Sequence, residues 1–309
     1  MAAGPEVHPR PGLPSAVRIY EVGPRDGLQA EAGIVPLAVK LELIERLADA
    51  GLTAIGATSF VSPRWVPQLA DADALFAGLR RRPGVRYPVL VPNQRGFDRA
   101  MAAGADEVAV FVSATETFAQ KNLGTSRDGA VEMAAPVISQ AREQGLGVRG
   151  YVSMVFGDPW EGSVPPEQAA AVAGRLVELG CHTISLGDTI GVGTAGHVPV
   201  LLDAVEAAGV SRSQVALHFH DTYGQALANV LAGLEAGVTE FDSSAGGLGG
   251  CPYAKSATGN LATEDLVWLL DGLGIRSGVD LESLVGTSRW LAGQLGRPSP
   301  SRVVRALSG

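Results

Sequence analysis

Two kinds of pattern alternate along the chain. Stretches with helical periodicity end in a small residue and a glycine, and a short apolar run follows each, as in "ADAGLTAIGATSF", "VELGCHTISLGD" and "LEAGVTEFDSSAGG". The glycine suits the position just after a helix, where left-handed backbone geometry is needed. The run that follows is apolar on both faces, which is typical of a parallel strand covered on both sides. The pattern therefore predicts alternating helices and buried parallel strands.

Eight such strands can be placed on the sequence. Their expected ranges are 17–23, 53–60, 87–92, 107–114, 148–155, 182–187, 215–220 and 239–244. Eight strand–helix units in 309 residues predict a TIM (β/α)8 barrel, an α/β fold. A doubly wound open sheet is the alternative, but no G-x-G-x-x-G follows the first strand.

We expect the barrel to occupy residues 16–275. Residues 1–15, with four prolines, predict a disordered tail, and residues 276–309 predict a C-terminal helical extension over the barrel. The first fourteen residues lack the apolar core of a signal peptide and the arginine-rich character of a transit peptide, so we expect a cytoplasmic protein. The net charge of −8 argues against binding to nucleic acid or to an anionic membrane.

Polar residues should gather where the strands of a barrel end, because its chemistry lies at that face. Such segments follow the first, second, sixth, seventh and eighth strands, as "EVGPRDGLQ", "TSF", "SLGDT", "HFHD" and "SSAGGLGGCPYA". Within the first three of these segments, Gln29, Ser59 and Ser185 are candidate substrate contacts.

His218 and His220 lie two apart in the seventh strand, so both side chains project from one face. Such a pair is either a set of hydrogen-bonded core histidines or part of a metal site. Asp26 ends the first strand and Asn260 lies in the loop after the eighth, and their oxygen atoms favour the metal site. Oxygen and nitrogen ligands without a thiolate suit Mg²⁺ or Mn²⁺.

Three further residues are candidates for catalysis. Arg25 is either a surface ion-pair partner or, beside a metal, a group that stabilises an enolate oxygen. Asp188 either orients a ligand and accepts a proton or is a turn aspartate. Cys251 lies in a glycine-rich loop that is typical of a lid, where a thiol can act as an acid–base group. Cys181, in contrast, is expected to be buried and inert.

The segments "EVGPRDGLQ", "ATSFVSPRWVPQLAD", "SLGDTIGVGT", "HFHDTYGQALAN" and "GGLGGCPYAKSATGNLATED" resemble the 3-hydroxy-3-methylglutaryl-CoA (HMG-CoA) lyase family of metal-dependent TIM barrels. The resemblance covers about residues 16–305. It implies that Asp26, His218, His220 and Asn260 bind a divalent metal, and that Arg25, Asp188, His218 and Cys251 are catalytic. The implied reaction is a retro-Claisen cleavage of the acyl-CoA into acetyl-CoA and acetoacetate. We also expect a homo-oligomer, in the form of a dimer.

Three positions depart from the pattern that the family usually shows. Gly56 replaces a carboxylate that points into the site, Ala32 lies where a lysine is usual, and Gly296 follows a leucine where an asparagine–arginine pair is common. The departures leave open a related lyase, aldolase or Claisen-type synthase that acts on another 3-hydroxyacyl-CoA. A non-catalytic barrel is a further alternative.

Overall fold

The structure is a computed structural model that describes residues 4–250 and 259–308. Its main sheet has eight parallel strands. They are β1 (Arg18–Glu21), β2 (Thr58–Ser59), β3 (Val89–Leu90), β4 (Glu107–Ser113), β5 (Gly147–Ser153), β8 (Thr183–Asp188), β9 (Val215–Phe219) and β10 (Glu240–Ser243). Each strand lies inside or within one residue of an expected range.

The sheet closes on itself into a barrel. Its strand order is β1-β10-β9-β8-β5-β4-β3-β2. The seam between β1 and the segment before β2 is made by backbone hydrogen bonds: the Glu21 amide donates to the Ala54 carbonyl at 2.9 Å, and the Gly56 amide donates to the Glu21 carbonyl at 2.8 Å. The TIM-barrel prediction is therefore confirmed.

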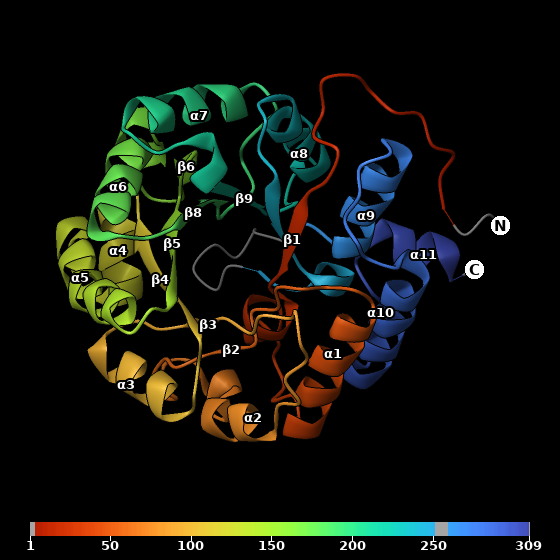
Figure 1. Cartoon of the computed structure of the whole chain (residues 1–309), viewed down its shortest axis with the longest axis horizontal. Helices are drawn as coiled ribbons and strands as arrows, with labels where there is room; N and C mark the ends of the chain where they lie inside the picture. The colour runs from red at the N-terminus through yellow and green to blue at the C-terminus, as the bar shows by residue number, and fades with distance from the viewer. Residues whose placement is uncertain (1–3, 251–258, 309) are drawn as a thin grey trace.

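Helices surround the barrel as an outer ring (Figure 1). Between and after the strands lie α1 (Leu37–Asp49), α2 (Ala72–Gly78), α3 (Gln94–Ala102), α4 (Glu116–Leu123), α5 (Arg127–Glu143), α6 (Pro166–Leu179), α7 (His197–Ala207), α8 (Ala226–Glu235), α9 (Thr263–Gly272), α10 (Leu281–Leu295) and α11 (Arg302–Leu307). Apolar residues of the helices and of the outward strand faces form one continuous buried core. None of the described helices is long and apolar enough to cross a membrane.

The C-terminal extension packs on the flank of the barrel. Helix α10 contacts α1 and α9, and α11 packs on both α9 and α10. Part of α10 also contacts the turn Ala245–Gly247 that follows β10. At the other end of the chain, the His8 amide donates to the Gly272 carbonyl at 2.8 Å. The domain boundaries and the disorder of residues 1–15 stay predictions.

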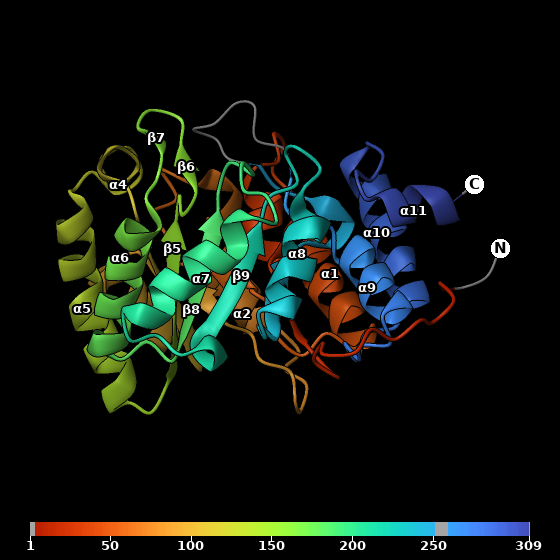
Figure 2. The ribbon, with the colours of Figure 1, turned by 90° about the horizontal axis from the view of Figure 1, so that it is seen from above.

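A short hairpin after β5 was not expected from the sequence. Strands β6 (Gly157–Asp158) and β7 (Gly162–Ser163) pair antiparallel and project at one end of the barrel (Figure 2). Asp158 stabilises the turn, because its carboxylate accepts hydrogen bonds from the Trp160 and Glu161 amides at 2.7 and 3.0 Å.

Cys181 agrees with the prediction of an inert thiol. Its side chain is only 2% exposed. Burial raises the pKa of the thiol to about 12, so the reactive thiolate is scarce at neutral pH.

Candidate metal centre and its cleft

Arg25 and Asp26 lie on a short π-helical turn, Gly23–Gly27, directly after β1. The Val22 carbonyl closes this turn by accepting hydrogen bonds from the amides of Asp26 and Gly27 at 2.8 and 3.1 Å. Such turns are rare and occur often at functional sites. This turn holds two adjacent charged side chains at the C-terminal end of the first strand.

His218 belongs to β9, and His220 follows its last residue. Their ring centroids are 5.3 Å apart, with 53° between the ring planes. Both imidazoles therefore lie on one face of the strand, as the spacing of two predicts.

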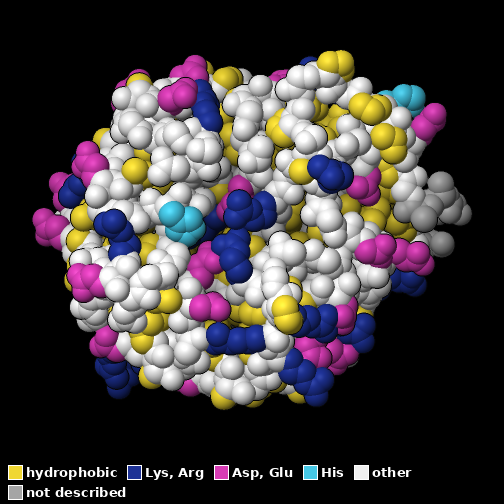
Figure 3. Space-filling model, in the orientation of Figure 1, with side chains coloured by type: hydrophobic (Ala, Val, Ile, Leu, Met, Phe, Trp, Pro, Cys, Tyr) yellow, Lys and Arg dark blue, Asp and Glu magenta, His cyan; other side chains and the backbone are white. Residues whose placement is uncertain are grey.

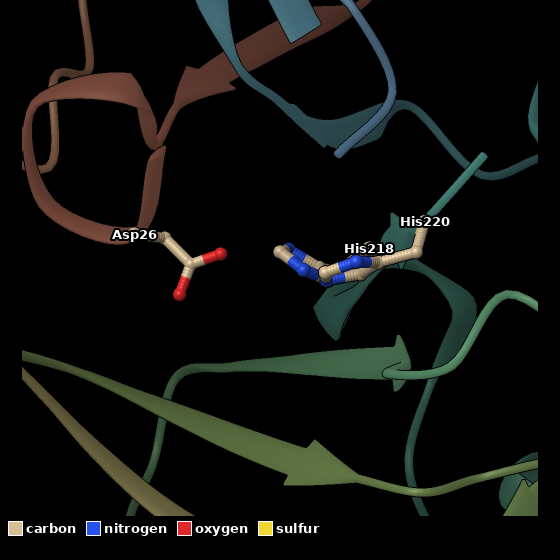
Figure 4. A group of neighbouring side chains, drawn as sticks. All are labelled: Asp26, His218 and His220. Atoms are coloured by element: carbon tan, nitrogen blue, oxygen red, sulfur yellow. The ribbon is translucent and has the colours of Figure 1, made fainter. Parts of the chain in front are cut away.

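Asp26 faces the two imidazoles across the mouth of the barrel (Figure 4). One ligand atom from each of Asp26, His218 and His220 can be chosen so that all three lie within 4.8 Å of one another. Within the part of the chain that the structure describes, this is the one such group of histidine, cysteine and acidic side chains. The three side chains converge from two strand ends that are far apart in the sequence.

Backbone pairing brings Asn260 to the same place. The Leu261 amide donates to the Phe219 carbonyl at 2.9 Å, and Asn260 forms an antiparallel bridge with His220. Gly249 permits the close approach, because a Cβ there would lie 2.3 Å from the Asn260 Nδ2. Asn260 and Leu261 thus lie along the end of β9.

The Asn260 side chain has one acceptor to spare. Its Nδ2 donates to the Asp26 Oδ2 and to the Leu248 carbonyl, both at 3.0 Å. Its Oδ1 is buried and has no hydrogen-bond partner in the described structure. A buried acceptor without a partner is costly unless a ligand completes it.

Arg25 and Asp26 form a charged pair beside the histidines. The Arg25 Nη1 donates to the Asp26 Oδ1 at 2.7 Å. Burial alone would raise the pKa of the Asp26 carboxyl, but the charges of Arg25, His218 and His220 outweigh it and lower the pKa to about 2. Burial would also lower the pKa of Arg25, but Asp26 raises it above its ordinary value. Both groups are therefore charged at neutral pH.

These donors fit a hard divalent cation. Two imidazole nitrogens, a carboxylate that is charged at neutral pH and a spare amide oxygen make a mixed nitrogen and oxygen set with no described thiolate. Such a set suits Mg²⁺ or Mn²⁺ better than a closed zinc site.

A second charged cluster lies deeper in the barrel, and the sequence did not reveal it. Arg149 on β5 forms ion pairs with Glu240 and Asp242 on β10. Burial would raise the pKa of the Asp242 carboxyl, but Arg149 lowers it below its ordinary value. A sequence signal for this cluster existed, because Glu240 and Asp242 lie two apart in a buried strand, as His218 and His220 do.

A cleft of about 810 Å³ opens over the candidate site, and Arg25, Asp26, His218 and His220 line its floor. Gln29 and Ala32 also line it, as does Tyr151, whose hydroxyl is buried without a partner in the described structure. The cleft also has an apolar wall. Its aliphatic and aromatic members include Ile34, Val61, Trp65, Val66, Leu90, Phe111, Phe118, Leu123 and Val152.

Among the described residues, the other sequence candidates lie outside the lining of this cleft. Ser59 and Ser185 are fully buried, and their hydroxyls donate to the Leu90 carbonyl at 3.2 Å and to the Asp242 carboxylate at 2.9 Å. These bonds give no support to substrate contacts, which stay a prediction for both serines. Cys251 lies outside the described residues.

Asp188 closes the turn after β8. Its two carboxylate oxygens accept hydrogen bonds from the amides of Val192 and Gly193 at 3.0 and 2.9 Å. Burial raises the pKa of this carboxyl to about 6. The geometry is that of a turn aspartate, and a role in proton transfer stays a prediction.

The three departures from the family pattern have different surroundings. Ala32 lines the cleft, but Gly56 is buried beneath it. A Cβ on Gly56 would lie 3.4 Å from the Tyr20 ring, which in turn stacks 4.3 Å from the Arg149 guanidinium carbon. An aromatic ring therefore adjoins the position of the missing carboxylate. Gly296 ends α10 in the left-handed conformation, with φ of 64°, and lies outside the cleft lining.

Two more buried carboxyls hold the base of the loop after β10. Glu21 accepts hydrogen bonds from the Ala245 amide at 2.9 Å and the Thr263 hydroxyl at 2.6 Å. Glu264 accepts from the Gly246 amide at 3.0 Å. Burial raises the pKa of Glu21 to about 7 and that of Glu264 to about 8.

The chain is similar to known lyases over nearly its whole length. The 3-hydroxy-3-isohexenylglutaryl-CoA/hydroxy-methylglutaryl-CoA lyase of Pseudomonas aeruginosa is 52% identical over 96% of this chain and 98% of its own. The crystal structure of hydroxymethylglutaryl-CoA lyase from Pseudomonas aeruginosa has a TM-score of 0.93, with 51% identity over 96% of this chain and 99% of that one. An HMG-CoA lyase from Acenitobacter baumannii, solved with coenzyme A and 3-methylmalate, has a TM-score of 0.91, with 37% identity over 94% of this chain and 95% of that one.

The sequence profile of the HMGL-like family matches residues 16–291, which span the barrel and most of α10. The match contains the π-helical turn, the histidine pair and the segment that carries Asn260. The chain belongs to the HMGL-like family.

Proposed function

We propose that this protein is a divalent-metal-dependent carbon–carbon lyase that cleaves HMG-CoA into acetyl-CoA and acetoacetate. The observation that carries the proposal is the convergence of Asp26, His218 and His220 at the floor of a cleft, beside the charged Arg25. The similarity to HMG-CoA lyases over nearly the full length supports the substrate, and the relative with bound coenzyme A supports an acyl-CoA.

Asp26, His218, His220 and the spare Oδ1 of Asn260 would hold the ion. A bound divalent cation supplies Lewis-acid chemistry, since it lowers the pKa of a hydroxyl and fixes its orientation. We propose Mg²⁺ or Mn²⁺ as the ion, since both accept a mixed set of oxygen and nitrogen donors.

Arg25 would stabilise the negative charge that develops as the carbon–carbon bond breaks. Retro-Claisen cleavage leaves the electron pair of the broken bond on the acetyl-CoA fragment as an enolate. Arg25 is only 9% exposed and lines the cleft. A fixed positive charge in a partly desolvated site acts where negative charge develops.

Asp188 is our candidate for the acceptor of the hydroxyl proton. Its pKa of about 6 is close to neutral, where a general base is most effective. Because its neighbours Gly187 and Thr189 line the cleft while Asp188 does not, the proton would pass through one water molecule. Cys251 would act from the loop after β10. The dimer and the cytoplasmic location likewise stay predictions.

The test is a metal-supplemented cleavage assay. HMG-CoA and an analogue with a longer 3-alkyl substituent are each supplied with Mn²⁺ or Mg²⁺, and acetyl-CoA is followed together with the keto acid. Turnover of HMG-CoA at about 1–10³ s⁻¹ is expected. Turnover of the longer analogue alone would contradict the assigned substrate, and no turnover of either by metal-bound protein would contradict the lyase activity.

A further inference from the structure

Asp242 lies directly beneath the candidate metal centre. It is the register partner of His218 across the β9–β10 pair, and its Oδ2 lies 3.2 Å from the His218 Nδ1. The Asp242 side chain has no exposed surface. The contact therefore lies on the inner side of the histidine, away from the cleft.

The Asp242 carboxylate is held from two other sides. Arg149 donates to its Oδ1, and the Ser185 hydroxyl donates to its Oδ2 at 2.9 Å. Arg149 is in turn paired with Glu240, and its guanidinium carbon stacks 4.3 Å from the Tyr20 ring centroid. Residues of four strands, β1, β5, β8 and β10, thus form one hydrogen-bonded and stacked cluster. This cluster holds the Asp242 carboxylate in one orientation.

This arrangement fixes which nitrogen of His218 carries the proton. A carboxylate only accepts hydrogen bonds, so an imidazole nitrogen that contacts it must be the N–H donor. In the neutral ring the other nitrogen, Nε2, then keeps its lone pair, and a lone pair is what a metal requires. In metal sites, an acceptor for the outer N–H fixes the orientation of the ring and makes it a better ligand.

We infer that Asp242 is a positioning residue, which holds His218 in the Nδ1–H tautomer with Nε2 directed at the ion. The Ser185 hydroxyl supports Asp242 in this role by donating to its Oδ2. The inference rests on the metal site of the proposed function but not on its substrate, because it concerns the binding of the ion alone.

The primary test compares two variants by calorimetric titration with Mn²⁺ alone. Asp242→Asn keeps the shape of the side chain but weakens the acceptor, and we expect Mn²⁺ to bind about 10–100-fold more weakly. Asp203→Asn is the matched control, since it makes the same change at an exposed carboxylate paired with Arg212, and we expect its Kd to stay within about threefold of wild type. Equal Kd values for wild type and Asp242→Asn would overturn the inference.

A second measurement needs no change to Asp242. In wild-type protein with ¹⁵N-labelled histidine, long-range proton–nitrogen spectra report the tautomer of each ring, and the His218 signals are those lost in His218→Gln. We expect a protonated Nδ1, and a protonated Nε2 with bare Nδ1 would overturn the inference even if Asp242→Asn failed to fold. Failure to cleave HMG-CoA, with the Kd contrast intact, would overturn the proposed substrate alone.

Discussion

Two charged clusters share the interior of this barrel, and they differ in how many ion pairs their charged side chains form. In the deeper cluster, Arg149 faces an acid through each of its two Nη atoms. At the mouth, Asp26 has only Arg25 as an ion-pair partner, and the Asn260 Oδ1 has no partner among the described residues. The clusters also differ in exposure, because the Asp26 side chain is 22% exposed whereas that of Asp242 has no exposed surface.

Ion pairs also gather at the opposite end of the barrel. Arg18 pairs with Glu240 at 3.2 Å, and Arg86 pairs with Glu107 where β4 begins. Lysine, arginine and acidic side chains cluster near the centre of that face (Figure 3). Buried charges that are paired, such as those of Arg149 and Asp242, hold the fold together. An acceptor without a partner at a strand end, such as the Asn260 Oδ1, marks a place for a ligand.

The largest effect is expected from removing the carboxylate of the candidate metal centre. Asp26→Asn should lower the cleavage rate by about 10³-fold, because several kcal/mol of charge stabilisation depend on the ion. The affinity for Mn²⁺, measured by titration, and the cleavage rate should fall together. Asp203→Asn, on an exposed carboxylate, is the control and should change neither. A variant at Asp26 with normal Mn²⁺ affinity would refute the metal centre.

Breaking the deeper cluster should cost stability. Arg149→Met leaves two buried acids without their cation, and we expect the free energy of unfolding to fall by about 3–5 kcal/mol. Arg175→Met removes an exposed pair with Asp128 and should cost less than about 1 kcal/mol. Urea unfolding measures both, and equal losses would show that the deeper cluster does not stabilise the fold.

The Gly56 position tests how tightly the deeper cluster is packed. Gly56→Glu alone should cost about 1–3 kcal/mol, because the new side chain meets the Tyr20 ring. The double variant Gly56→Glu with Tyr20→Val should recover at least about 1 kcal/mol, since the two positions are in contact. A thermodynamic cycle from urea unfolding gives the coupling, and strict additivity would show that the ring does not limit position 56.

The smallest expected effect is the pH dependence of stability that comes from the buried carboxyl of Glu264. Burial raises the pKa of Glu264 from 4.5 to about 8, so the folded state binds its proton more tightly than the unfolded chain. The resulting stability is complete below about pH 4.5 and is lost as the pH rises through about 8.

Glu264→Gln removes this titration. Between pH 5 and 9 the wild-type Tm should therefore fall by about 3–6 °C more than that of the variant. Glu282→Gln, on the exposed side of α10, is the control and should follow wild type. Parallel melting curves for wild type and Glu264→Gln would contradict the pKa shift.

The sequence predicted the parts of this molecule that local pattern controls. Strand positions follow from apolar runs after glycine, and the shared face of His218 and His220 follows from the two-residue repeat of a strand. The network of Arg149, Asp242 and His218 was not predicted, because it depends on register between strands that lie far apart in the sequence. The β6–β7 hairpin was missed because its strands consist of glycine, aspartate and serine, so no apolar run marks them in the sequence.

The seam of the barrel bears on how this site can evolve. The ring closes there through the amide of Gly56 and the carbonyl of Glu21, so no side chain at position 56 takes part in the closure. Selection can therefore exchange side chains at 56, together with the neighbouring position 20, without opening the barrel. Proline is the exception, because it alone lacks the amide hydrogen. A lineage can thus alter the side chains packed beneath the cleft while the closure of the barrel is inherited intact.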